Sequence, residues 1–513
     1  MSDSKQHIIS GTFWNFFGTI LKIIIGIGGS ILFVRYLGEA DYGISIYLFD
    51  TVLLLITVSS LGLGTFQAKE FPRLKKRKLF NQYKHLFFYN LKIRFFLLAL
   101  LLIIAALYFV SSGSDSAGRL INYFGYFVCF AVLQLLLAAF RGPLQQEYQQ
   151  RFLNLLATSF LLVRISLVFV VIWLDLGLKG FLLTEVVVEI CQLIIVSLRF
   201  RKMVWIKIRN LKSEPLPGGI FPRALYFFAG DLSSKIFSKE FDVLMIGWMF
   251  RGDTFSAITF YSLSYLLVLR SFSFLGFGTA NTATLLLTYS SDLLSSGRSH
   301  RLSSLLEKQI KLLVGFVIPL TLGGVLLGEE LLVLMYGASF EGKGFVVRCL
   351  FLGYCIFSVT YITKPLIYAL GLEKRLIKVR LSLVLAKIVL LLFLATGNSL
   401  ERVVIVATII LVVLSIFEMW ILYRKVPTFS FPKIYTLKIV CASVAMSVWV
   451  LGVDFVNVSQ SISLLVSIIG GVVVYILGLF WLKPFSLEDC KLLEGSGLGG
   501  FFNPARFLSH FAH

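Results

Sequence analysis

Charged residues are scarce in this sequence, and acidic ones most of all. Asp and Glu together number 27 in 513 residues, and all charged residues make up 15% of the chain. Hydrophobic residues make up 58%, and the mean hydropathy is +0.87. A water-soluble domain keeps roughly a quarter of its residues charged. The composition therefore excludes an ordinary soluble protein and indicates a polytopic membrane protein.

The residues that build metal and redox sites are also scarce. The six cysteines show no metal-ligand spacing, and five of them lie in predicted membrane spans, where they read as small apolar residues. All five histidines lie in segments predicted to be cytoplasmic, which argues against a histidine proton relay within the membrane. No P-loop pattern is present, and the connections between spans are too short for a catalytic domain. We expect no metal, no cofactor and no enzymatic activity.

Long apolar runs, in contrast, fill most of the chain. Stretches of about 20 mostly apolar residues are the length that crosses a bilayer as a helix. They predict fourteen transmembrane helices, at residues 10–34, 43–65, 91–111, 120–140, 153–173, 178–198, 224–250, 255–278, 310–328, 345–370, 379–396, 402–423, 434–453 and 462–482. The first span is followed by Arg35 and not by a small-residue cleavage site, which indicates a retained helix.

The basic excess indicates topology and does not predict nucleic-acid binding. Lys and Arg number 48, which gives a net charge of +21. If both termini are cytoplasmic, 34 of these 48 residues fall in cytoplasmic connections and tails, and the bias alternates at every loop, as the positive-inside rule requires. We therefore predict N-in, C-in topology. The densest basic cluster, residues 69–78, is predicted to contact anionic lipid headgroups.

Charged residues inside the spans are the main functional candidates. Each costs about 2.5 to 3.5 kcal/mol at a helix centre, so such groups face a bundle interior or a wet cavity. The span 224–250 carries five charges. Four of them, Asp231, Lys235, Lys239 and Asp242, are spaced by 4, 4 and 3 residues and so lie on one helical face, whereas Glu240 lies on the opposite side. Two interpretations stay open. The four could form a ladder of i, i+4 pairs that only neutralises the helix, or a stripe that lines a hydrated cavity.

Further charges lie near the middle of other spans. Lys22 lies in the first span and Arg164 in the fifth. Glu185 and Glu189 lie one turn apart on the sixth span, and we predict that one or both pair with Arg164. Asp50, in the second span, is a further acidic candidate.

A short internal echo indicates two related halves. Gly38-Glu39 follows the first span and Gly252-Asp253 follows the seventh, each near an arginine and an aromatic residue. Six spans separate the copies, so both would have the same orientation in the membrane, related by an axis along its normal. The predicted architecture is all-α, with two six-helix lobes and a terminal helix pair. Its predicted parts are residues 1–223, 224–428, 429–483 and a tail at 484–513.

Several short motifs carry a family resemblance that covers nearly the whole chain. They are Ser10-Gly11 to Phe17, residues 35–43 (RYLGEADYG), 61–64 (LGLG), 242–247 (DVLMIG) and 331–337 (LLVLMYG). In these the chain resembles the polysaccharide-transport branch of the multidrug/oligosaccharidyl-lipid/polysaccharide exporter superfamily, the Wzx-type flippases of O-antigen and capsule repeats.

The resemblance implies a multi-pass protein of the bacterial inner membrane that flips an undecaprenyl-diphosphate-linked oligosaccharide to the outer leaflet. It also implies that polysaccharide polymerase and chain-length machinery are partners. In such families, cationic residues of spans one, seven and eight line the cavity, here Lys22, Lys235, Lys239 and Arg270, where a low dielectric would strengthen their attraction for the diphosphate. Charge pairing or ion coupling would fall to Asp50, Arg164, Glu185, Glu189, Asp231 and Asp242.

Three alternatives stay open. Two belong to the same superfamily: a lipid II flippase, or a cation-coupled drug exporter, in which a lysine-bearing cavity would repel the substrate. The third, a membrane-embedded glycan polymerase or ligase, should carry a large external loop with catalytic residues. No predicted external connection has that length.

Overall fold

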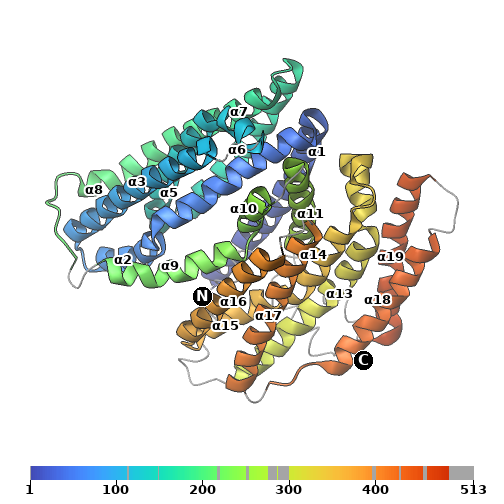
Figure 1. The fold of residues 1–513 in the computed structure, drawn as a ribbon. Coiled ribbons are helices and arrows are strands. Elements are labelled where there is room, and N and C mark those ends of the chain that lie inside the picture. Colours follow the sequence, from blue (N-terminus) through green and yellow to red (C-terminus); the bar gives the residue numbers. More distant parts are fainter. Residues whose placement is uncertain are drawn as a thin grey trace. The chain divides into compact units, whose positions relative to one another are not determined.

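The computed structural model describes residues 2–111, 115–147, 149–216, 220–249, 253–274, 286, 290, 300–394, 400–426, 429–453 and 459–484. The regular elements within these ranges are all helical, which confirms the predicted fold class (Figure 1). The first part of the chain holds α1 (Ser2–Ser60), α2 (Leu63–Lys76), α3 (Phe80–Ser111), α4 (Asp115–Ile121), α5 (Phe124–Gln146), α6 (Gln150–Trp173), α7 (Gly177–Phe200), the π-helix η1 (Arg201–Trp205), α8 (Ile206–Ile208), α9 (Phe221–Ile236), α10 (Lys239–Met249) and α11 (Thr254–Phe274). The later part holds α13 (His300–Tyr336), the 3₁₀ helix η2 (Ala338–Phe340), α14 (Gly344–Phe357), α15 (Thr360–Ala369), α16 (Glu373–Leu394), α17 (Leu400–Lys425), α18 (Lys433–Val453) and α19 (Gln460–Leu482).

Every predicted span overlaps a helix. Within the described residues, eleven helices are long and apolar enough to cross a membrane. One of them, Ile23–Ser60, contains two predicted spans, because Gly38 interrupts α1 with φ 77° and ψ 170°. The predicted spans 224–250 and 379–396 are not among the eleven; the first is broken into two helices, and the second lies largely on α16, which carries several charges. The count of fourteen and the N-in, C-in topology stay predictions.

Two compact units divide the chain. One contains residues 24–262 and 392–399, and the other contains residues 1–23, 263–391 and 400–513. By their contacts, α9 and α10 therefore group with the helices that precede them. The predicted lobe boundary at residue 223 and the predicted repeat stay predictions, and Gly252 of the second repeat copy lies outside the described residues.

The unit of residues 24–262 is built on a helical bundle with an aromatic core. Helix α7 packs against α5 and α6, while α2 packs against α3, α5 and α9 (Figure 1). One hydrophobic core lies where α2, α3 and α5 to α9 meet. Its buried side chains from α2, α3, α5 and α6 are Leu63, Phe66, Phe71, Leu74, Tyr83, Leu86, Phe87, Leu137, Leu144 and Leu153. Burial of aromatic side chains supplies much of the packing energy here, since each removes about 150 to 250 Å² from solvent.

Glycines of the family motifs lie where two backbones or a backbone and a ring approach closely. A Cβ at Gly43 would lie 2.0 Å from the backbone oxygen of Phe255, so only glycine lets α1 and α11 touch here. Gly62, at the N-cap of α2, has φ 72°, and a Cβ there would lie 2.3 Å from the backbone of α9. A Cβ at Gly247 would meet the ring of Tyr47 at 2.2 Å. The motifs therefore encode helix contacts in this unit.

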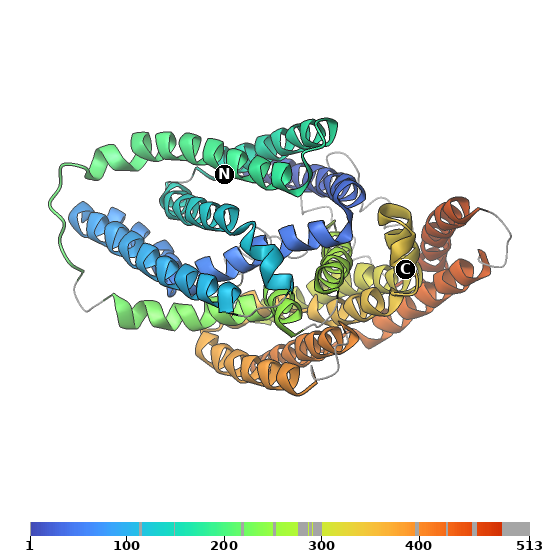
Figure 2. The same cartoon turned by 45° about the horizontal axis from the view of Figure 1, so that its top comes forward.

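The second unit packs α13 against α14 and α18, α14 against α17, and α18 against α19. The pair α18 and α19 is visible side by side in both cartoon views (Figure 2). The side chain of Glu418 on α17 is fully buried, receives a hydrogen bond of 2.6 Å from Thr363 Oγ1 of α15, and forms an ion pair of 2.9 Å with Arg380 of α16. This buried pair joins three helices, a geometry that the isolated charge in the sequence did not indicate.

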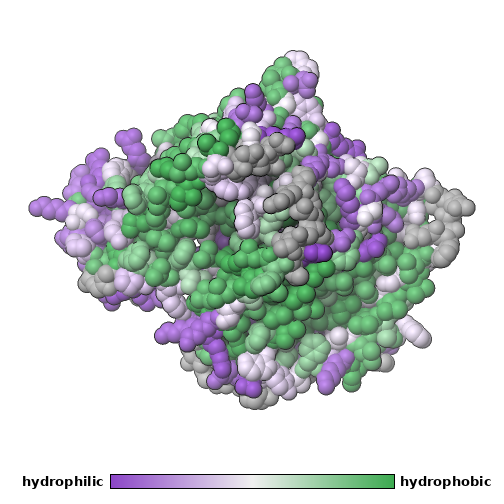
Figure 3. Space-filling view, viewed as in Figure 1, coloured by the Kyte–Doolittle hydropathy of each residue, from purple (hydrophilic) through white to green (hydrophobic). Residues whose placement is uncertain are grey.

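Large hydrophobic side chains are exposed along the helices of both units. Helices α3, α6, α7, α16, α17, α18 and α19 each carry several, among them Phe96, Ile103, Trp173, Phe393 and Trp481. Hydrophobic residues cover much of the visible face in Figure 3. In water this exposure would be unfavourable by about 25 cal/mol per Å² of apolar surface. The chain is a multi-pass membrane protein.

Candidate functional site

The predicted charged span 224–250 is broken in the middle. Helix α9 ends at Ile236 and α10 begins at Lys239. The hydroxyl of Ser238 and its backbone N–H both donate to the carbonyl oxygen of Lys235, at 2.7 and 3.1 Å. Serine side chains compete with the helical hydrogen-bond ladder in this way. The prediction of one continuous helix with four charges on one face is wrong, because its periodicity does not carry across the break.

The two lysines at this break each contact a carboxylate, although not the ones that helical spacing predicts. Lys239 Nζ lies 2.7 Å from Asp50 Oδ2 on α1. Lys235 Nζ lies 2.5 Å from Glu240 Oε1, across the break, so Glu240 does not point to the opposite side as a continuous helix would require. All four side chains are less than one-third exposed. The i, i+4 ladder is therefore wrong as an account of these two lysines.

The two aspartates of the span also contact other helices. Asp231 Oδ2 receives a hydrogen bond of 2.8 Å from Thr65 Oγ1 of α2. Asp242, which is almost fully buried, receives one of 2.7 Å from Tyr261 Oη of α11. Helices α1, α2, α9, α10 and α11 therefore converge on a charged cluster, defined here as Asp50, Asp231, Lys235, Lys239, Glu240 and Asp242.

A second polar group lies among α5, α6 and α7. Arg164 NH2 lies 2.9 Å from Glu185 Oε2 and 3.5 Å from Glu189 Oε1, so the predicted pairing is present with both glutamates. Arg141 of α5 donates a hydrogen bond of 2.5 Å to Gln192 Oε1 of α7. Both glutamates are buried, whereas Arg164 is part-exposed. Arg164 therefore joins α6 to α7, and its removal would leave two buried carboxylates without a counter-charge, which is strongly destabilising. A role in ion coupling stays a prediction.

The remaining predicted cations, Lys22 and Arg270, belong to the unit that does not contain the charged cluster. Arg270 lies on the part of α11 that belongs to the second unit, where it interacts electrostatically with Tyr336 of α13. The backbone of Lys22 lies in α1, but its side chain is outside the described residues. The grouping of both residues with Lys235 and Lys239 stays a prediction.

Sequence reasoning missed several buried polar partners. Arg94 on α3 lies in the predicted span 91–111 but is not among the predicted site residues, although its side chain is 6% exposed. Tyr261 and Gln192 carry no charge, and Glu240 was read as facing away. A useful signal was available for Arg94, since it follows Asn90 by one turn and begins a strongly apolar run.

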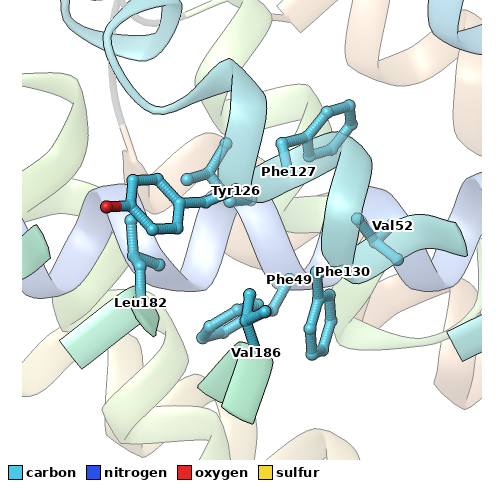
Figure 4. A pocket seen from close by; sticks show the side chains of 8 residues that line it. Phe49, Val52, Tyr126, Phe127, Phe130, Leu182 and Val186 are labelled. Atoms are coloured by element: carbon cyan, nitrogen blue, oxygen red, sulfur yellow. The ribbon is translucent and has the colours of Figure 1, made fainter. Parts of the chain in front are cut away.

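The pocket in Figure 4 is apolar and does not suit a charged ligand. It lies among α1, α5 and α7 and is lined by aromatic and aliphatic side chains, Leu48, Phe49, Val52, Tyr126, Phe127, Phe130, Leu182 and Val186 (Figure 4). No group of three or more His, Cys, Asp or Glu side chains suited to a metal ion occurs in the described part of the chain. The charged cluster is therefore the candidate functional site of this unit.

Solved structures share the fold at low sequence identity. A structure entitled "Lipid II flippase MurJ, inward closed conformation" matches with a TM-score of 0.68 and 15% identity, over 90% of this chain and 97% of that one. An inward-facing multidrug resistance MATE family transporter matches with a TM-score of 0.62 and 12% identity, over 79% and 94%. A transporter from Pyrococcus furiosus, described as having a binding pocket of reverse polarity, matches with a TM-score of 0.55 and 13% identity, over 80% of this chain and 93% of that one.

The fold is that of the multidrug/oligosaccharidyl-lipid/polysaccharide exporter superfamily, as the motifs predicted. No curated protein sequence matches the chain. Residues 8–277 match the family described as polysaccharide biosynthesis protein, which is more than half of the chain. The chain belongs to this family.

Proposed function

We propose that the chain is a flippase that moves an undecaprenyl-diphosphate-linked oligosaccharide across the bacterial inner membrane by alternating access. The observation that carries this proposal is the pair of half-buried lysines, Lys235 and Lys239, at the break between α9 and α10. Charges in a medium of low effective dielectric attract each other more strongly than in water. Two ammonium groups, one on each side of this break, suit the two phosphates of the lipid carrier.

The ion pairs at this break provide a means of exchange. Lys239 is paired with Asp50 of α1, and Lys235 is paired with Glu240 of α10. An ammonium group has three donors, so diphosphate oxygens can replace carboxylate oxygens one at a time. Replacement at Lys239 removes an ion pair that joins α10 to α1. Substrate binding thereby changes the relative stability of helix arrangements, which is what a transport cycle requires.

A lipid II flippase is the second candidate, favoured by the likeness in fold to MurJ. Its substrate also has a polyprenyl diphosphate, so the lysines would have the same role. The polyprenyl chain would remain in the bilayer in either case, because its hydrocarbon is most stable there. The two substrates differ in the glycan.

The test replaces the two lysines together, by Lys235→Gln and Lys239→Gln, in the host strain deleted for its chromosomal copy. We expect loss of surface glycan with normal membrane insertion, because diphosphate loses both cations. Lys343→Gln, a cation change outside the charged cluster, is the control and should leave surface glycan unchanged. Unchanged glycan in the double variant would refute the role of the lysines. Rescue of cells depleted of their lipid II flippase would instead favour the second candidate.

A further inference from the structure

A buried arginine on α3, Arg94, adjoins one member of the charged cluster, Asp231. The side chain of Arg94 on α3 is 6% exposed, and its Nε is buried without a hydrogen-bond partner in the described part of the chain. The acidic group that acts on it electrostatically is Asp231 of α9. A guanidinium has five N–H donors, and leaving such donors unsatisfied in a buried place is costly. An anion would satisfy them.

The amide nearest to Arg94 along α3 is that of Asn90, whose nitrogen donates to another residue and whose Oδ1 is buried without a hydrogen-bond partner among the described residues. Asn90, one turn earlier on α3, donates to Gln67 Oε1 of α2. Gln67 in turn donates from Nε2 to the carbonyl oxygen of Leu86, at 3.3 Å. These two amides therefore form a local buried network of their own. The guanidinium of Arg94 lies beyond this network, toward the start of α2.

The start of α2 adds positive charge at the same place. A Cβ at Gly64, in the first turn of this 14-residue helix, would lie 2.4 Å from Arg94 NH2, so the missing side chain makes room for the guanidinium. The N-cap Gly62 provides no side-chain cap. Free amide groups and the helix dipole make a helix N-terminus electropositive. A cation such as Arg94 next to this N-terminus is unfavourable. An anion between Arg94 and the N-terminus would be stabilised by both.

The first turn of α2 is exposed at one residue, Thr65, and this residue contacts α9. Thr65 is exposed at the first turn of α2, and its hydroxyl donates to Asp231, which is only part-buried. Asp231 therefore contributes a carboxylate next to both the helix start and Arg94. A carboxylate there resembles the oxygen chemistry of a phosphate. The Asp231 carboxylate can therefore compete with a phosphate for the same donors.

We infer that Arg94, the first turn of α2 and Thr65 form a phosphate-binding site in which Asp231 is the resident competing anion. The ligand chemistry is a phosphate or diphosphate ester. It could come from a phospholipid headgroup or from the lipid carrier of the proposed substrate, and in the second case the inference rests on the proposed function. With the predicted topology, the site lies at the cytoplasmic end of the unit, where a substrate made in the cytoplasm is loaded.

The test measures binding of inorganic pyrophosphate to the purified full chain in nanodiscs of neutral phosphatidylcholine, by isothermal titration calorimetry. We expect binding to wild type, and binding weaker by about tenfold or more in Arg94→Gln, since a charge-assisted interaction is lost. Lys84→Gln is the matched control on the same helix, because Lys84 donates to backbone carbonyls of residues 209 and 211. It should bind as wild type does.

Three results would overturn the site: no binding to wild type, equal binding in Arg94→Gln, or an equal loss in Lys84→Gln. If Arg94→Gln does not fold, pyrophosphate binding to Asp231→Asn tests the site instead. Removing a like charge should strengthen pyrophosphate binding by about tenfold at an effective dielectric of about 20, and unchanged binding would overturn the site.

Nanodiscs containing phosphatidylglycerol separate the two ligand sources. Weaker pyrophosphate binding in these discs, seen with Arg94 present, would identify a lipid headgroup as the competing ligand. Unaffected binding would support the diphosphate carrier. None of these measurements involves glycan transport, so a negative result refutes this site and leaves the proposed function to the glycan assay.

Discussion

The ion pair between Lys239 and Asp50 gives a prediction that separates stability from transport. Its 2.7 Å contact corresponds to about 6 kcal/mol of gross attraction at an effective dielectric of about 20. Desolvation of both groups offsets much of this, and a net coupling of about 2 to 3 kcal/mol is expected. Asp50 is the more buried partner, with 8% of its side chain exposed against 24% for Lys239.

The perturbation is a double-mutant cycle with Lys239→Gln and Asp50→Asn. Lys239→Gln alone should cost about 3 kcal/mol in free energy of unfolding, because it leaves a buried carboxylate unpaired. Asp50→Asn alone should cost less, because the part-exposed lysine regains solvent. The double variant should be closer to wild type than the sum of the single changes predicts. Unfolding in mixed micelles, followed by circular dichroism, measures all four proteins.

A matched control is the pair Lys311 and Glu307 on α13, an i, i+4 contact of 3.2 Å in which the carboxylate side chain is 36% exposed. Its coupling should not exceed about 0.5 kcal/mol. Additive effects at Lys239 and Asp50, or a coupling no larger than that of the control, would refute the account of the cluster. If the double variant is stable and still exports no glycan, Lys239 acts on the substrate as well as on Asp50.

Two further predictions concern packing and charge pairing. Gly43→Ala should destabilise the protein by about 2 kcal/mol or more, because its Cβ would overlap a backbone oxygen. Gly28→Ala should be neutral or slightly stabilising, because no atom lies within 4 Å of the added Cβ. Thermal unfolding of the two variants compares these effects. Charge reversal by Arg164→Glu should lower folded yield, and Glu185→Arg or Glu189→Arg in the same chain should partly restore it, as measured by size-exclusion chromatography. Equal melting temperatures for the two glycine variants, or no rescue by either reversal, would contradict the contacts described above.

The general architecture could be read from the sequence because its signals are local. Apolar length predicts a helix that crosses a bilayer wherever its neighbours lie, and every predicted span overlaps a helix. The pairing of Arg164 with Glu185 and Glu189 was also predictable, since α6 and α7 are joined by a short connection and must lie side by side. A short loop restricts how the two helices that it joins can pack, and therefore which of their charged side chains can meet.

The charged cluster was not predictable in the same way. Helical periodicity placed Asp231, Lys235, Lys239 and Asp242 on one face, but the period applies only while the helix continues, and Phe237 and Ser238 interrupt it. Arg94 begins an apolar run, and an arginine at such a position can lie either in solvent or in a protein core. The sequence pattern is the same in both cases. Only packing against neighbouring helices decides between these places.

The sequence by itself determined that this is an all-helical membrane protein with charges in its spans, and its motifs indicated the family. The tertiary structure alone decided which groups meet: Lys239 with Asp50, Lys235 with Glu240, and Arg94 with the first turn of α2. The physical reason is that hydrophobic length and period belong to one helix. Partners depend on how helices rotate and tilt against each other, which is set by close contacts such as those at Gly43 and Gly62.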